Sequence, residues 1–276
     1  MGVVLGLLAA LCYGASDFAA GAGGRRASSE AVAIMSQPFG LAAAIVAVVL
    51  LDAHSPATSA LIWGAVAGLG SGVGTLALYR GLTVGRMSVV APLSAVLTAA
   101  LPAVVGIATG DTLSPLRVAG LGLALPAIAL VSRQASDVGD RASGITEGLV
   151  AGAGFAVLFI GLARAGTHSG AWPLVPGQAM AVATVVTIGL LSGSTGGTWR
   201  AAWWPAVLTG VGGGTANLFY LAATGYGQLS VVAVVTALYP VVTIVLARTL
   251  LDERWARVQT VGLMLAALAI GLISVS

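Results

Sequence analysis

Apolar runs of roughly 20 residues recur along the whole chain, and this is the length that an α-helix needs to cross a bilayer. Charged residues, prolines and Gly/Ser clusters separate ten such runs. They cover residues 3–21, 31–51, 60–80, 86–108, 115–134, 145–163, 171–191, 203–223, 228–250 and 256–275. In lipid every backbone polar group needs an internal partner, which favours helices. The predicted fold class is therefore all-α, a polytopic membrane protein with ten transmembrane helices.

The composition excludes a soluble protein. Hydrophobic residues make up 58% of the sequence and charged residues only 8%, whereas a soluble domain carries about 25% charged residues. The connections between the runs are short and leave no room for an extramembrane domain. We expect a multi-pass protein of the cell membrane whose main partner is the lipid bilayer.

The basic residues give a topology signal. The net charge is +3 and all basic residues are Arg, scattered between the apolar runs. A nucleic-acid partner would need a clustered basic face, so none is expected. Ten Arg flank the connections after odd-numbered runs, and only Arg117 and Arg164 flank the others. An excess of Arg marks cytoplasmic loops, which predicts that both termini lie outside the cell.

Few residues could support enzyme chemistry. Cys12 is the only cysteine, and His54 and His168 fall in separate connections with no ligand spacing around them. These features favour neither a metal centre nor acid–base catalysis. The sequence predicts a protein that is not an enzyme and that binds no cofactor and no metal.

The chain contains an internal repeat. The stretch from Gly85 to Thr98 aligns without a gap to the stretch that begins at Gly227, 142 positions later, with six identities in fourteen positions. At the same offset, residues 120–132 resemble 262–274, and Asp111 aligns with Glu253. We predict two five-helix units, residues 1–134 and 145–276, joined by a polar connection. Because five spans is an odd number, the second unit enters the membrane from the opposite side, as in transporters with inverted repeats.

Two short runs resemble a known family. Residues 13–18 (YGASDF) and 237–242 (ALYPVV), the latter followed by Asp252-Glu253-Arg254, are similar to EamA-type repeats of the drug/metabolite transporter superfamily. The resemblance implies two EamA-like repeats around a central cavity lined by spans 1, 3, 4, 6, 8 and 9. Members export amino acids, other metabolites or drugs, or import sugars. Many have cytoplasmic termini, opposite to the Arg count, so the orientation stays open.

Two prolines are candidates for the cavity. Pro92 and Pro240 lie in runs four and nine, which correspond in the two units. A proline within a span removes one backbone donor and frees a carbonyl, which then needs a partner or a wet cavity. A packing kink without ligand contact is the alternative. Pro240 predicts a bend in the ninth span.

Asp17 is the acid that the run boundaries place deepest in a span. An ionisable group inside the membrane costs roughly 3 kcal/mol on insertion scales and marks a candidate functional site. The carboxylate could exchange a proton for substrate or bind an amine. Alternatively it could reach the headgroups and pair with Arg25 or Arg80.

Further polar side chains within the runs are expected to face the helix bundle. Asn217 is the strongest candidate for the cavity, because its amide has both donors and acceptors to satisfy. Gln37 and Gln178 are interpreted as packing contacts, since the resemblance leaves spans 2 and 7 peripheral. The remaining candidates are Tyr13, Ser16, Tyr79, Ser94, Tyr220, Thr236 and Tyr239.

Together these features predict a secondary transporter that moves a small metabolite, an amino acid-like compound or a drug by alternating access, in the direction of export. Energy would come from the substrate gradient or from protons, with Asp17 as the candidate for proton coupling. A sugar or nucleoside uptake permease is the alternative. A non-transporting membrane subunit and an integral membrane enzyme are alternatives of another class, and the oligomeric state is left open.

Overall fold

The computed structural model describes residues 1–24, 29–51, 56–84, 87–132, 144–191, 199–251 and 256–275. Within these ranges it contains α-helices and no strand. The helices are α1 (Gly2–Gly24), α2 (Ser29–Leu50), α3 (Thr58–Val84), α4 (Met87–Ala108), α5 (Pro115–Val131), α6 (Ile145–Ala165), α7 (Leu174–Leu191), α8 (Trp199–Thr224), α9 (Leu229–Thr236), α10 (Tyr239–Leu251) and α11 (Arg257–Val275).

The predicted fold class is confirmed, because the described residues form a polytopic all-α membrane protein. Nine helical segments in these ranges are long and apolar enough to cross a membrane, and α9 with α10 counts as one of them. The tenth predicted span is α5, which is apolar but only 17 residues long. Ser114 caps its start by accepting a hydrogen bond from Arg117 N, with Pro115 at the first helical position.

The start of the predicted span 171–191 is corrected by three residues. Helix α7 begins only at Leu174. It follows a turn at Gly170, whose φ of 54° lies in the left-handed region that favours glycine. The apolar character of residues 171–173 therefore reflects burial in this turn, since Ala171 and Pro173 are buried.

The ninth predicted span is divided in the structure. Helix α9 ends at Thr236 and α10 begins at Tyr239, so the break lies just before Pro240. Proline has no backbone donor and its ring clashes with the carbonyl four residues earlier, here that of Thr236. Val241 N donates instead to Leu238 O at 3.0 Å, which is the tighter bonding of a turn. Helix α4 differs, because it continues through both Pro92 and Pro102.

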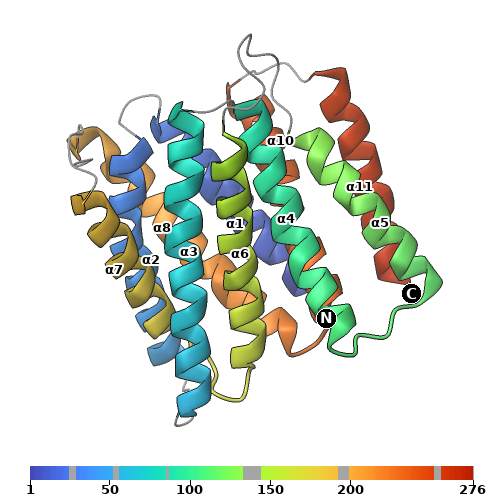
Figure 1. The fold of residues 1–276 in the computed structure, drawn as a ribbon, viewed down its shortest axis with the longest axis horizontal. Helices are drawn as coiled ribbons and strands as arrows, with labels where there is room; N and C mark the ends of the chain where they lie inside the picture. Colours follow the sequence, from blue (N-terminus) through green and yellow to red (C-terminus); the bar gives the residue numbers. More distant parts are fainter. Residues whose placement is uncertain are drawn as a thin grey trace.

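The helices pack in a pattern that is similar in the two halves of the chain. Helix α1 packs on α8 as α6 packs on α3, and α2 packs on α8 as α7 packs on α3. Helix α4 packs on α6 as α10 packs on α1, while α5 packs on α11 and α2 on α7. Figure 1 shows α2 and α7 at one edge of the bundle and α5 and α11 at the other. Both termini lie at the same end of the helices (Figure 1).

Glycines allow the closest of these helix contacts. A methyl group at Gly68 of α3 would overlap the carbonyl oxygen of Gly177 in α7. In the same way, a methyl group at Gly210 of α8 would overlap Ser36 O in α2. Small residues of this kind let membrane helices approach at backbone distance. Gly68 and Gly210 thus serve close helix packing.

Candidate functional site

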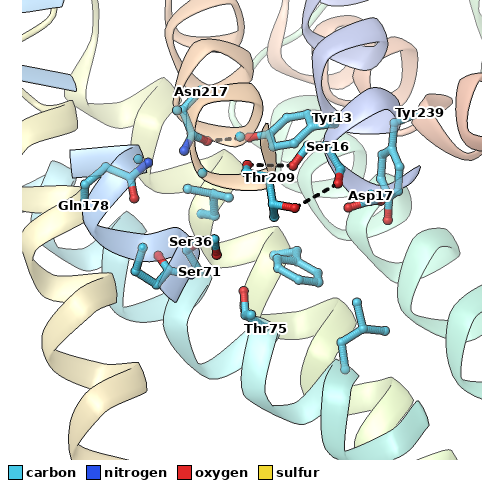
Figure 2. Close-up of a pocket in the computed structure, with 18 of the residues that line it drawn as sticks. Tyr13, Ser16, Asp17, Ser36, Ser71, Thr75, Gln178, Thr209, Asn217 and Tyr239 are labelled. Carbon is cyan, nitrogen blue, oxygen red and sulfur yellow. Dashed lines mark hydrogen bonds between the residues drawn. The ribbon is translucent and has the colours of Figure 1, made fainter. Parts of the chain in front are cut away.

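A cavity of about 130 Å³ lies within the helix bundle (Figure 2). Its lining comes from both halves of the chain, namely from α1 to α4 in the first half and from α6, α7, α8 and α10 in the second. Polar side chains make up much of the wall. They are Tyr13, Ser16, Asp17, Ser36, Gln37, Ser71, Thr75, Thr98, Gln178, Thr209, Asn217 and Tyr239.

Helix α1 turns one face to lipid and another to the cavity. Its exposed apolar residues include Val4, Leu8 and Leu11, which lie on one side of the helix. Asp17 is also exposed, but at 3.6 residues per turn it lies roughly 150° around the axis from that apolar side. Asp17 and Tyr13 both line the cavity. The exposed surface of Asp17 therefore belongs to the cavity and not to the lipid face.

Hydrogen bonds join α1 to α8 along the cavity wall. Ser16 Oγ donates to Thr209 O at 2.8 Å, and Thr209 Oγ1 donates to Ser16 O at 3.3 Å. Tyr13 OH donates to Asn217 Oδ1, on the same side of the cavity (Figure 2). Each hydroxyl is thus satisfied at the helix contact. The amide nitrogen of Asn217 and the hydroxyl lone pairs remain for a ligand.

An aromatic cluster lies at the cavity, on the side toward the end of the bundle that holds the termini. Successive spans alternate in direction (Figure 1), so α6 and α8 both end on that side. Near these ends Phe159 stacks on Tyr220, with ring centroids 4.2 Å apart, and Tyr13 lies 6.0 Å from Phe159. Tyr220 is fully buried and its OH donates to Phe159 O at 3.2 Å.

Five of the residues proposed from the sequence lie on the cavity wall, and these are Tyr13, Ser16, Asp17, Asn217 and Tyr239. Figure 2 shows them on neighbouring helices, with Asp17 beside Tyr239.

Other proposed residues lie behind the wall. Thr236 is fully buried and its Oγ1 donates to Gly6 O at 3.4 Å, while Tyr220 belongs to the aromatic cluster. Ser94 is buried against Gly152 of α6. Neither Pro92 nor Pro240 is among the lining residues. The side chain of Tyr79 falls outside the part that the structure describes, as do Arg25 and Glu253.

The cavity also includes polar residues that were not predicted from the sequence to line it. Gln37 of α2 and Gln178 of α7 were expected to be packing contacts, yet both line the wall. Gln178 also packs against Gly40, as the packing interpretation requires. The signal in the sequence is an amide within an apolar run, whose donors and acceptors all need partners. Five hydroxyl residues that were not proposed from the sequence also line the wall, namely Ser36, Ser71, Thr75, Thr98 and Thr209.

The described residues contain no group of three or more His, Cys, Asp or Glu side chains arranged to hold a metal ion. Asp17 is the one charged residue among those that line the cavity in the described part of the chain. The wall can therefore offer hydrogen bonds, aromatic faces and a single carboxylate to a ligand.

Comparisons with known proteins support these observations. A solved structure, described only as the crystal structure of a protein, shares the fold with a TM-score of 0.77 over 99% of this chain and 96% of its own. The two sequences are 18% identical, so this likeness concerns the fold alone. No curated protein matches the sequence. Residues 142–275 match the model of the EamA-like transporter family. The second half of the chain is thus similar to the EamA-like transporter family of the drug/metabolite transporter superfamily.

Proposed function

We propose that the protein is a secondary transporter that exports a small metabolite across the cell membrane by alternating access. The observation that carries this proposal is the cavity, which lies within the spans and takes polar side chains from both halves of the chain. Polar groups inside a membrane bundle are costly unless they serve packing or a ligand. Several of the polar side chains that line the cavity face its open space instead of a partner helix. Export is proposed from the family resemblance.

The size of the cavity suits a small molecule. A cavity needs roughly 10–15 Å³ to hold one water molecule, and this cavity offers about 130 Å³. A ligand with on the order of ten non-hydrogen atoms would fill it. This is the size of an amino acid-like compound or a small amphipathic metabolite.

Alternating access would follow from two inverted five-helix repeats, residues 1–134 and 145–276. The similar packing of the two halves supports this division, because exchanging the halves converts the α1–α8 contact into α6–α3 and the α2–α8 contact into α7–α3. Inverted repeats give a transporter two related states that open to opposite sides. In this proposal, the stacked rings of Phe159 and Tyr220 would close the terminus side in one of the two states. The second state would close the other side by the corresponding contacts.

Energy for transport would come from the substrate gradient or from protons. Asp17 is the group proposed for proton coupling, since its carboxylate lies on the cavity wall within α1. A single carboxylate that binds either a proton or the substrate would couple the two movements in opposite directions.

The test is transport by the purified full chain in proteoliposomes that contain no other protein. A panel of labelled amines, amino acids and sugars is assayed with and without a proton gradient. Substrate movement by this chain alone would support the proposal, whereas a complete absence of movement across the panel would favour a non-transporting subunit. Loss of the proton-gradient effect in Asp17→Asn would assign the coupling role to Asp17, and an unchanged effect would remove it.

A further inference from the structure

We infer that the cavity selects a small amphipathic organic cation, an amine whose charged head lies at Asp17 and whose apolar body lies against α6. This inference rests on the proposed function and names its substrate class. It stands on the charge, the aromatic groups and the apolar wall of the same cavity.

The charge of the wall is the first reason. Asp17 is the only charged residue among the lining residues that the structure describes. No hydrogen bond or ion pair ties its carboxylate to another described residue, and its side chain is exposed to the cavity. A carboxylate in a membrane bundle is expected to have a partner. A protonated amine would supply one from the ligand.

The groups around Asp17 suit an organic cation. Figure 2 shows the ring of Tyr239 beside the Asp17 carboxylate, and the Tyr13 ring lies 6.1 Å from that of Tyr239. The two rings are tilted by 55° to each other. An ammonium group within about 6 Å of an aromatic face is attracted by the ring quadrupole. The carboxylate and the two tyrosines thus form a site for an amine head at the α1–α10 side.

The part of the wall formed by α6 is apolar. Phe155, Leu158 and Phe159 of α6 line the cavity together with Leu78 of α3. These side chains offer no hydrogen bond to a ligand, so they favour an apolar body, ideally an aromatic ring. A polyhydroxylated sugar would leave several hydroxyls unpaired against this wall, which is costly in a closed site.

An anionic group would find no partner of opposite charge among the described lining residues. None of the described lining residues is basic. The N-terminus of α10 lies in mid-span and could attract an anion, but Pro240 lacks a donor and Val241 N is already bonded to Leu238 O. The preceding residues 230–238 are all buried and do not line the cavity. An amine is therefore preferred to an amino acid, whose carboxylate would find amide and hydroxyl donors but no basic side chain among the described lining residues.

The test compares three probes that share one aryl skeleton and differ in charge. Phenylethylamine is the cation, phenylethanol is its uncharged counterpart and phenylalanine adds a carboxylate. Binding to the full chain in lipid nanodiscs is measured by calorimetry at neutral pH. We expect the amine to bind about tenfold more tightly than the alcohol and more tightly than the amino acid.

Variants of Asp17 test whether its carboxylate causes the preference for the amine over the alcohol. Asp17→Asn should remove the difference between amine and alcohol, and Asp17→Glu should keep it. Glu147→Gln is the matched control, because it makes the same chemical change in the first turn of α6, outside the cavity lining. It should leave the preference unchanged. If Asp17→Asn does not fold, the binding of the three probes to the unmodified chain still tests whether the cavity prefers the amine.

Several results would overturn the inference. Among them are equal binding of amine and alcohol, equal binding of amine and amino acid, a preference that survives in Asp17→Asn, or no amine binding at millimolar concentration. A transport assay with the same probes separates this inference from the proposed function. If the amine binds selectively but is not moved in proteoliposomes, the binding inference stands and the transport proposal fails. If the chain transports other compounds and shows no preference for the amine, the transport proposal stands and the binding inference fails.

Discussion

At the scale of single residues, the site depends on side chains that form hydrogen bonds with one another and also line the cavity. Tyr13 shows this double role, because its OH donates to Asn217 Oδ1 while its ring lines the cavity and lies near Phe159. A hydrogen bond between membrane helices contributes on average about 0.6 kcal/mol to stability. Its removal should therefore affect ligand binding more than folding.

Tyr13→Phe tests this role. The substitution removes the donor to Asn217 and leaves the ring in place, so we expect a loss of stability of no more than about 1.5 kcal/mol. Transport should fall severalfold, since Asn217 is freed to change rotamer. Tyr226→Phe is the control, because Tyr226 is 69% exposed and outside the cavity lining. If Tyr13→Phe and Tyr226→Phe transport at the same rate, the proposed role of Tyr13 is wrong.

At the scale of elements, most of the fold can be predicted from the sequence and the details of one span cannot. Apolar length alone identifies each span, because the membrane sets the length of a helix that crosses it. Proline is less informative. Pro102 lies within the continuous α4, whereas Pro240 follows a break. Sequence pattern does not separate these cases, since the neighbouring helices decide whether the freed groups find partners.

Part of the candidate site could also be predicted from the sequence, because polar residues stand out within apolar runs. Tyr13, Ser16 and Asp17 stand out because they interrupt one apolar run. Gln178 stands out less, since an amide in a span can equally bond a neighbouring helix. Its place at the cavity follows from how α7 packs on α3 and α2, which is a property of the assembled bundle.

Pro240→Ala tests the importance of the break between α9 and α10. Both pieces are tied to α1, with Thr236 Oγ1 donating to Gly6 O and Thr243 Oγ1 donating to Gly14 O. Alanine restores the backbone donor and favours one continuous helix, which would move Tyr239 relative to Asp17. We expect a folded protein with severalfold slower transport. Pro126→Ala, in the continuous and peripheral α5, should transport normally, and equal rates in the two variants would contradict this role.

Asp111→Ala tests how α9 is capped. Gln228 at the start of α9 makes no side-chain cap bond, and Ser230 N donates instead to Asp111 Oδ2 at 2.8 Å. Loss of such a cap costs about 1 kcal/mol, so the thermal unfolding temperature should drop. In Thr249→Val the lost hydroxyl bonds only its own helix in an exposed position, and we expect little change. An unaltered unfolding temperature in Asp111→Ala would show that the cap adds no stability.

At the scale of the whole molecule, the central claim is that the transported compound passes through the cavity between the two halves. The packing of α1 on α8 and of α6 on α3 encloses this space. A path of this kind can be blocked by filling the cavity without disturbing the packing around it. Gly213 of α8 is suited to this, because it lines the cavity and a methyl group there would meet only Ser16 Oγ at an ordinary distance of 3.7 Å.

The most direct measurement compares Gly213→Val with Gly122→Val in proteoliposomes that contain only this chain. Gly122 is exposed on α5 with nothing within 4 Å of an added methyl group, so the second variant makes the same change away from the cavity. Both should fold, since valine has a slightly better helix propensity than the glycine that it replaces, by a few tenths of a kcal/mol. We predict that Gly213→Val abolishes substrate movement while Gly122→Val retains the rate of the unmodified chain. Transport by a folded Gly213→Val protein at the unmodified rate would contradict the claim that the cavity is the transport path.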